Sequence, residues 1–559
     1  MQPVSTAPSP WLHRYANGFH AWKREEQGDS VLFKRPIGLV EGFFDSDGVH
    51  FGGRADFHTI LNVEIRSSET TLSLRRRILL AWTNLRVQHV LLGSSVRIDT
   101  DNGLRSFHVH VPRTVESAID EASRNVMFLE DDYPGVEFDA FYKHVMSTGR
   151  TITESKGVSR LFVLPLRQTS TQTFELTLIQ IAGHLVLDGM TSYSWSSHFV
   201  HLLNQSETEL LAQIETFTKA EKVRTVLPPA QEDLYPVVPG NVARQRWFWA
   251  VMRVLRHTKR PMPSGFANPV CRRVQHSPSL PMPAKYPKAF DYSPHNQPPL
   301  ETGSIAFKIP HAAAQRLILL SRSAGASIGA GCFALTGMAM MALETKLHPL
   351  VPLPERKPFT ASFPLNPRPF FGYDGPADSC MLAFSEGVVL PWLPVDLDVE
   401  GRFKILCRRA HEGLKSYQKG LRDQVEGLDS HSPLRLLANG YLGAIERSGI
   451  DVQGAYAARS LAGAATCGVS SVGSVRAFLH QGMYPLEKNT NKDFVVDFRA
   501  VRHGVRAREN EFLVACAGHG DGTLHFGASY DATAMDDAMV RLWREMMQSI
   551  LEPEQQPKL

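Results

Sequence analysis

Two residues whose side chains can do acid–base chemistry, His184 and Asp188, stand four positions apart in the stretch IAGHLVLDGM, residues 181–190. An imidazole can act as a base near neutral pH because its ordinary pKa is about 6.5. An aspartate four residues later could orient that imidazole or hold a tight turn. The chain has 22 histidines, so a His-x-x-x-Asp match is expected roughly once by chance. The spacing alone therefore does not separate a catalytic base from a buried histidine.

The elements expected around this motif place it at the end of a strand. The apolar run at 173–181 predicts a buried strand, and residues 191–203 predict a helix. The motif then lies on the loop between them, and such loops often carry binding and catalytic residues. Gly189, directly after the aspartate, suits either a backbone position that a side chain would block or an ordinary turn.

The totals exclude several classes of protein. A chain of 559 residues is too long for one ordinary core, which predicts at least two lobes. Sixty basic and 56 acidic residues give a net charge of only +4, which argues against a dedicated nucleic-acid binder. None of the six cysteines forms a Cys-x-x-Cys pair. We therefore expect no disulfide framework, no metal site and a reducing, cytoplasmic compartment.

Two segments bear on membranes and secretion. Residues 1–11 lack the basic and then apolar order of a signal peptide. Residues 325–343 carry no charge but are rich in glycine, alanine and serine, so their hydrophobicity is weak for a membrane span. We expect a tightly packed internal helix there and no membrane partner, with a span as the alternative.

The chain divides at a proline-rich stretch. Residues 257–301 hold ten prolines among lysines and arginines, which predicts a long irregular crossover between two lobes. Strands and helices alternate on both sides, so the predicted class is α/β. We expect an N-terminal lobe at 1–256 and a C-terminal lobe at 302–559. The expected elements include helices at 115–130, 311–323 and 534–551 and strands at 381–390 and 494–498.

At residues 183–189 the sequence resembles a known superfamily. Gly-His-Leu-Val-Leu-Asp-Gly is similar to the HxxxDG signature of the chloramphenicol-acetyltransferase-like fold, which non-ribosomal peptide condensation domains, plant BAHD acyltransferases and fungal alcohol acetyltransferases share. Further resemblances follow in order along the chain: the segment after the first helix at 85–92, the post-strand arginine motif Asn366-Pro367-Arg368, the Ser-Asn-x-Gly strand at 470–473 and the closing hairpin at 524–531. The length, the Trp-rich helix near residue 247 and the crossover most resemble fungal trichothecene 15-O-acetyltransferases.

The sequence also departs from the superfamily. Gly183 stands where condensation domains usually carry a second histidine, and Ser471 stands where the Ser-Asn-x-Gly motif has asparagine. The plant-type DFGWG motif is absent, and residues 493–497 are the nearest stretch. These departures disfavour a plant-type enzyme and weaken the match at the 470s strand.

The resemblance implies a two-lobed fold in which helices flank a mixed sheet in each lobe and the active site occupies a tunnel between the lobes. It implies that His184 removes the proton of an acceptor hydroxyl. It also implies that Asp188 turns away from His184 and pairs with Arg368 to fix the loop beside Gly189. A hydroxyl of Ser470 or Ser471, or a nearby backbone N–H, would stabilise the oxyanion.

We therefore expect an acyl-CoA-dependent O-acetyltransferase of the EC 2.3.1 type. It would move an acetyl or other short acyl group to a hydroxyl of a secondary metabolite, such as a trichothecene or another terpenoid. Acetyl-CoA would be a cosubstrate, no cofactor would be bound permanently, and the protein would be a monomer. Two alternatives stay open: a condensation-type domain that joins carrier-bound substrates through an amide or ester, and a non-catalytic binding protein on the same fold.

Overall fold

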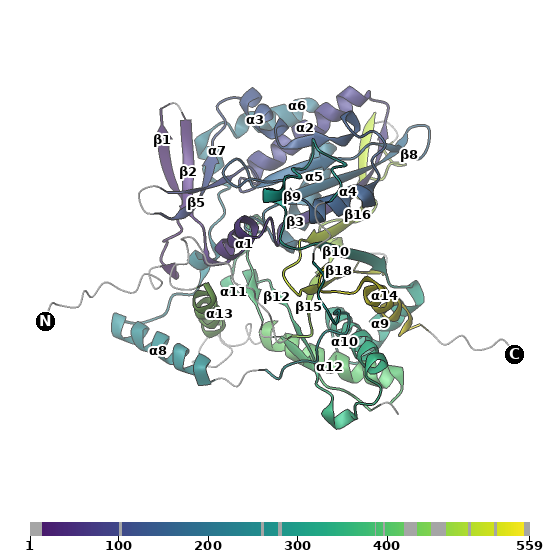
Figure 1. Cartoon of the computed structure of the whole chain (residues 1–559). Coiled ribbons are helices and arrows are strands. Elements are labelled where there is room, and N and C mark those ends of the chain that lie inside the picture. The colour runs from purple at the N-terminus through teal and green to yellow at the C-terminus, as the bar shows by residue number, and fades with distance from the viewer. Residues whose placement is uncertain are drawn as a thin grey trace.

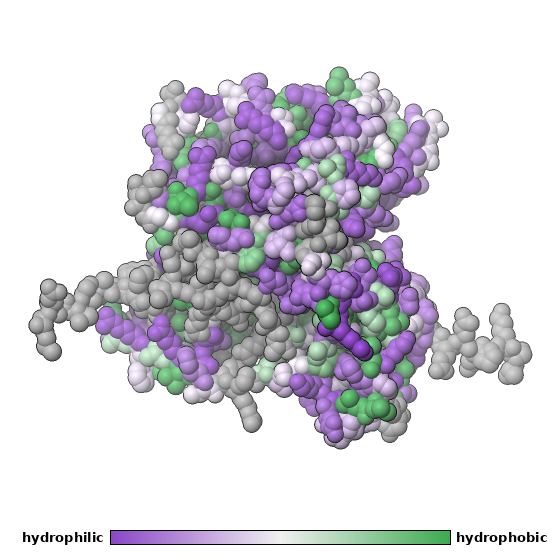
Figure 2. All heavy atoms as spheres, in the orientation of Figure 1, coloured by the Kyte–Doolittle hydropathy of each residue, from purple (hydrophilic) through white to green (hydrophobic). Residues whose placement is uncertain are grey.

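The computed structural model describes residues 14–28, 30–99, 103–258, 262–277, 282–385, 387–394, 397–418, 433–448, 465–489, 493–518 and 522–552. Figure 1 shows two lobes, with most of the first half of the chain in the upper lobe and most of the second half in the lower one. The face drawn in Figure 2 is mostly hydrophilic, with hydrophobic residues scattered over it.

The upper lobe is built on a mixed six-stranded sheet. Its strands follow the order β16 (Phe494–Val505), β3 (Phe57–Ser67), β9 (Thr173–Ala182), β7 (Ser159–Val163) and β6 (Val126–Phe128), and β8 (Arg167–Gln168) also pairs with β9. Only β6 and β7 run parallel. A separate four-stranded sheet has the order β1 (Lys23–Gln27), β2 (Ser30–Pro36), β5 (Arg105–His110) and β4 (Ser95–Ile98).

Helices flank the six-stranded sheet on both faces. The helices of the first half are α1 (Leu39–His50), α2 (Thr71–Gln88), α3 (Val115–Ser123), α4 (Phe138–Ser147), α5 (Gly189–Leu203), α6 (Glu207–Thr216), α7 (Ala220–Arg224) and α8 (Val242–Thr258). Side chains of α2 and α5 share a core with alternate residues of β3 and β9. The intervening residues of β9, including Ile179 and Ile181, pack against α4 on the other face. This alternation is what a half-turn per residue in a strand produces.

The lower lobe has its own mixed six-stranded sheet. The order is β10 (Thr302–Lys308), β18 (Leu524–Asp531), β17 (Phe512–Gly518), β15 (Cys467–Ser474), β11 (Phe359–Ser362) and β14 (Val388–Leu390), with β15 parallel to both of its neighbours. A short pair joins β12 (Pro364–Leu365) to β13 (Ala383–Phe384). The helices are α9 (His311–Ser323), α10 (Ile328–Leu347), α11 (Arg368–Phe371), α12 (Val399–Gln418), α13 (Pro433–Ser448) and α14 (Asp537–Ser549).

The uncharged stretch forms the central helix of the lower lobe, as predicted. Helix α10 is the one described helix long and apolar enough to cross a membrane, but 72% of its most apolar window is buried in the molecule. It packs against α9, α12 and α14. Small residues permit this close packing: an added Cβ at Gly337 would lie 2.8 Å from a methyl carbon of Leu390.

One strand crosses between the lobes. Strand β16 comes from the second half of the chain but forms the edge of the upper sheet, pairing with β3 from Phe494 to Val505. Figure 1 shows it in yellow-green beside the blue strands. The crossover also touches both lobes, because Phe266 lies in the lower core and Phe290 in the upper one. The division into 1–256, 257–301 and 302–559 remains a prediction. Strand β16 and the crossover both connect the two lobes.

Some expected elements are wrong in extent. The helix predicted at 115–130 ends at Ser123, and residues 126–128 form β6 because they find a parallel partner in β7. The strand predicted at 381–390 is broken into β13 and β14, which belong to different sheets. Gly387 between them has a φ of 128°, which only glycine adopts without strain. Helix α1 was missed, since glycine and aspartate interrupt its apolar residues.

Candidate active site

The loop after β9 is anchored in the core by its own apolar residues. Leu185, Val186 and Leu187 are at most 1% exposed and belong to the core of the upper lobe. The Gly183 N–H donates to Val158 O at 2.9 Å, and the Val186 N–H donates back to Gly183 O at 3.1 Å, closing a turn. The turn leaves His184 half-buried among fully buried neighbours. The three apolar residues therefore anchor the loop in the core, and the imidazole that precedes them is carried on a rigid backbone.

Two aromatic rings fix the orientation of the His184 imidazole. Phe44 of α1 stacks on it with centroids 3.8 Å apart and planes 5° apart. Phe57 of β3 meets it edge-on at 5.2 Å and 88°. Neither residue was predicted, and the only signal for Phe44 in the sequence was the broken helical pattern at 39–50. One stacked ring and one edge-on ring leave the imidazole little freedom to rotate.

The surroundings keep the imidazole of His184 neutral. Its pKa is lowered to about 4, mainly by burial and also by the charge of Arg508, although backbone groups of His184 and Leu187 and the charge of Asp188 partly offset this. Nδ1 is buried and has no hydrogen-bond partner among the described residues. No described hydrogen bond involves Nε2, and the residue as a whole keeps part of its surface exposed. The free nitrogen that a base requires is therefore available at pH 7.

Asp188 turns away from His184 and caps helix α5. Its Oδ1 accepts hydrogen bonds from Met190 N at 2.9 Å and from Thr191 N at 3.0 Å. These are two of the backbone donors that every helix leaves unpaired at its first turn. Its Oδ2 lies 2.9 Å from Nη2 of Arg368, so the expected ion pair is present. Both side chains are at least nine-tenths buried.

Arg368 connects this cap to a segment of the lower half. Its Nη2 also donates to Ser379 O at 2.7 Å, and the Thr191 hydroxyl donates to the same oxygen at 2.8 Å. The Met381 N–H donates to Oδ2 of Asp188 at 2.9 Å. The carboxylate, the guanidinium and residues 379–381 thus form one buried network. The network holds the loop of His184 against the second half of the chain.

Gly189 lies where the loop of His184 comes close to strand β15. A Cβ added to it would stand 3.2 and 3.3 Å from the two γ-carbons of Val472. Val472 sits at a bulge in β15, between the paired residues Ser471 and Gly473. The close approach, rather than an ordinary turn, therefore accounts for glycine here, because its φ lies outside the left-handed region.

The two predicted serines lie on opposite faces of β15. The Ser471 hydroxyl is hydrogen-bonded to Cys516 and stands 3.4 Å from a Cβ built on Gly329, so it points toward α10. Ser470 is half-buried and, by strand alternation, points to the other face of the sheet. No described hydrogen bond joins either serine to His184. Their oxyanion role remains a prediction, and the alternation favours Ser470 over Ser471.

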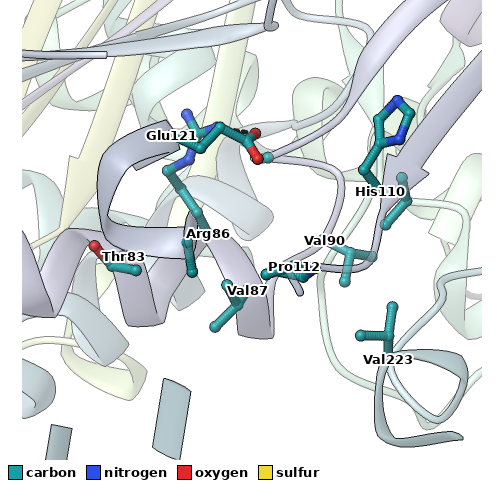
Figure 3. Close-up of a pocket in the computed structure, with 11 residues that line it drawn as sticks. Thr83, Arg86, Val87, Val90, His110, Pro112, Glu121 and Val223 are labelled. Carbon is teal, nitrogen blue, oxygen red and sulfur yellow. Dashed lines mark hydrogen bonds and ion pairs between the residues drawn. The ribbon is translucent and has the colours of Figure 1, made fainter. Parts of the chain in front are cut away.

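Two pockets lie beside or away from this loop, and neither is lined by His184. Figure 3 shows a narrow pocket of about 30 Å³ between α2, α3 and β5, which contains none of the predicted site residues and has room for water only. An open pocket of about 580 Å³ is lined by Arg150, Arg160 and Lys288. Nη2 of Arg150 would lie 3.7 Å from a Cβ on Gly183, so this pocket lies near the motif. The tunnel between the lobes remains a prediction.

Among the described residues, no group of three or more histidine, cysteine, aspartate or glutamate side chains could hold a metal ion.

Two lobes, each a mixed sheet flanked by helices, with an HxxxDG loop at the end of a strand, define the chloramphenicol-acetyltransferase-like fold, as predicted. The structure is similar to that of TRI3 trichothecene 15-O-acetyltransferase from Fusarium sporotrichioides, with a TM-score of 0.63, 13% identity and coverage of 96% of this chain and 98% of that one. It is also similar to the condensation domain of the monacolin K polyketide synthase MokA, with a TM-score of 0.51, 13% identity and coverage of 93% and 96%. No protein-family model and no curated protein sequence matches the chain.

Proposed function

We propose that this protein is an acyl-CoA-dependent O-acetyltransferase that acts on a hydroxyl of a secondary metabolite, with a trichothecene or another oxygenated terpenoid as the acceptor. The observation that carries the proposal is His184, a neutral imidazole held by Phe44 and Phe57, with no described hydrogen bond at Nε2. The similarity to a trichothecene acetyltransferase supports the same reading through the fold. We propose a cytoplasmic monomer without a permanently bound cofactor.

The reaction needs one general base and one hydrogen-bond donor. Nε2 of His184 takes the proton of the acceptor hydroxyl while the oxygen attacks the thioester carbonyl carbon. The negative charge that develops on the carbonyl oxygen is stabilised by a donor on the Ser470 face of β15. When the tetrahedral intermediate collapses, the C–S bond breaks and the leaving thiolate takes the proton from His184. No serine or cysteine nucleophile is required, because the thioester is already activated.

Asp188 does not belong to a catalytic triad in this proposal. Its two oxygens are occupied by the helix cap, Arg368 and Met381 N. An aspartate engaged in this way cannot also orient the imidazole. Its role, with Arg368, is to position the loop that carries His184.

The basic pocket near Gly183 supports a phosphorylated cosubstrate. Arg150 is paired there with Asp56, and Lys288 is paired with Asp132. Arg160 contacts no carboxylate among the described residues; its Nη1 donates to Ala289 O at 3.2 Å, and burial lowers its pKa. A half-buried guanidinium without an acidic partner favours an anion, so we propose that Arg160 attracts the phosphates of the donor.

The condensation-type alternative rests on the similarity to the MokA domain. Gly183 occupies the position of the second histidine, and an added Cβ there would stand 2.5 Å from a methyl group of Leu185. The position therefore suits a small residue, which favours the carrier-independent reading. A binding protein without turnover would not need a neutral imidazole at His184.

The test is to incubate the protein with acetyl-CoA and a panel of hydroxylated terpenoids that includes trichothecene polyols, and to measure acetyl mass gain and free thiol. Wild type should acetylate at least one alcohol. His184→Ala should lose about 10²–10⁴-fold in kcat and keep its circular dichroism spectrum. No acetylation and no thiol release by wild type would overturn the proposal. Activity from a carrier-bound acyl group alone would establish the condensation reading instead.

A further inference from the structure

A second histidine stands beside the proposed site and has no part in the mechanism above. His503 lies on β16, directly across from Thr59 of β3. Its ring packs 4.9 Å from Phe57, the same ring that meets His184 at 5.2 Å. One aromatic side chain therefore contacts both imidazoles, and the two rings are close enough for the charge of His184 to act on His503.

A buried chain of hydroxyl groups determines which nitrogen of His503 carries the proton. Nε2 of His503 is 2.9 Å from the Ser192 hydroxyl, which is 2.7 Å from the Thr59 hydroxyl. If Nε2 donated to Ser192, Ser192 would donate to Thr59, and the buried Thr59 proton would have no acceptor among the described residues. Leaving a buried donor unpaired is costly. The opposite direction satisfies every group, so Thr59 donates to Ser192, Ser192 donates to Nε2, and the proton of His503 lies on Nδ1.

Nδ1 of His503 is the free end of this chain. It has no described hydrogen-bond partner, and His503 is half-buried rather than fully buried. Burial, followed by the charge of His184, lowers the pKa of His503 to about 3, so the ring is neutral. The chain from Thr59 thus ends in one fixed N–H donor beside the base.

We propose that His503 is a substrate-binding residue whose Nδ1–H donates a hydrogen bond to a second oxygen of the acceptor alcohol, next to the hydroxyl that His184 deprotonates. The inference rests on the proposed function and narrows its substrate class. The acceptor must carry, besides the reacting hydroxyl, another hydroxyl, ether or carbonyl oxygen on a compact, rigid skeleton. An alcohol without that oxygen leaves a desolvated N–H unpaired, and sites of this kind reject such analogues strongly.

The test pairs variants with substrates. The probe is the panel alcohol that wild type acetylates fastest, together with its deoxy analogues, each lacking one oxygen that does not react. His503→Phe keeps an aromatic ring and removes the donor; His503→Gln keeps a donor. His110→Gln, an exposed histidine on β5, is the matched control. With wild type, we expect the kcat/KM of one deoxy analogue to be about tenfold or more below that of the parent alcohol, mostly because KM rises. His503→Phe should not lower the kcat/KM of that analogue any further. His503→Gln should restore part of the discrimination.

Nitrogen-15 spectra of histidine-labelled wild type test the tautomer without turnover. The signal that disappears in His503→Phe should show a protonated Nδ1 and an unprotonated Nε2, and Ser192→Ala should mix the two tautomers. A protonated Nε2 in wild type overturns the proposal. Equal losses by His503→Phe on the parent alcohol and on every deoxy analogue also overturn it, since they indicate a structural role. If wild type acetylates no alcohol, the proposed function fails first, and the spectra still decide whether the donor exists.

Discussion

The carboxylate of Asp188 serves two structures at once: one oxygen caps helix α5 and the other binds Arg368 at 2.9 Å. Asp188 comes directly before α5, whereas Arg368 begins α11 in the second half of the chain. The ion pair therefore lies at the end of the loop that carries His184 and connects this loop to α11. An aspartate that looks like a partner for the histidine is instead part of the scaffold.

Removing either member of this pair should damage folding more than chemistry. Asp188→Ala leaves a buried guanidinium without its partner, which we expect to cost about 3–5 kcal/mol in the free energy of unfolding. Arg368→Ala should cost about as much. The matched control is Asp536→Ala, which removes the cap of α14, whose arginine partner is more exposed, and should cost about 0.5–2 kcal/mol. Urea unfolding measures all three, and equal losses at Asp188 and Asp536 would contradict the scaffold role.

Gly189 should resist even the smallest side chain. Alanine at the start of a helix is normally favourable, but here its Cβ would crowd both γ-carbons of Val472. We expect Gly189→Ala to destabilise the protein by about 1–3 kcal/mol. Val472→Ala removes both γ-carbons and should recover most of that loss in the double variant. Additive effects in the double-mutant cycle would show that the close approach is not the reason for glycine.

The activity of the folded protein should persist at acidic pH. The base form of His184 is present above its pKa of about 4, so lowering the pH from 7 to 5.5 should not protonate it. We expect the acidic limb of kcat/KM to fall near pH 4 rather than near 6.5, as far as the fold survives. The measurement is initial rates after brief exposure, corrected for the folded fraction. A limb near pH 6.5 would mean that the site is more hydrated than the structure shows.

Stability should decline over the same acidic range for the same physical reason. Unfolding returns His184 to an ordinary pKa of about 6.5, so the unfolded state binds more protons than the folded state between about pH 6.5 and 4. Stability that is present at neutral pH is therefore lost as the pH falls, by about 2 kcal/mol for this group between pH 7 and 5. His503, whose pKa is about 3, adds to the loss. His184→Gln should show a drop smaller by about 2 kcal/mol in urea titrations at the two pH values, and an unchanged drop would contradict the assignment.

Arg160 should affect the binding of the acyl donor, acetyl-CoA, and not the binding of the acceptor alcohol. We expect Arg160→Ala to raise the KM for acetyl-CoA about tenfold and to leave the KM for the alcohol unchanged, because only the donor carries phosphates. High salt should weaken donor binding by wild type more than by the variant. Lys288→Ala, which removes an exposed lysine of the same pocket, is the control and should change little. An equal rise in both KM values would indicate that the phosphates of the acyl donor do not bind at Arg160.

The sequence by itself determined the local features of this protein. The apolar run before His184 predicted β9, and the small residues of 325–343 predicted a buried helix. These features depend on neighbours in the chain and on the periods of strands and helices. The pairing of Asp188 with Arg368 came from the resemblance and is present in the structure.

Only the tertiary structure decided which distant residues surround the imidazole. Phe44, Phe57 and His503 come from α1, β3 and β16, and no spacing in the sequence connects them with His184. Strand β16 enters the upper sheet from the second half of the chain because its hydrogen-bonding edge matches β3, a partner more than 400 residues away. The neutral state of His184 likewise follows from burial by these side chains, because desolvation depends on what packs around a group and not on its own letter.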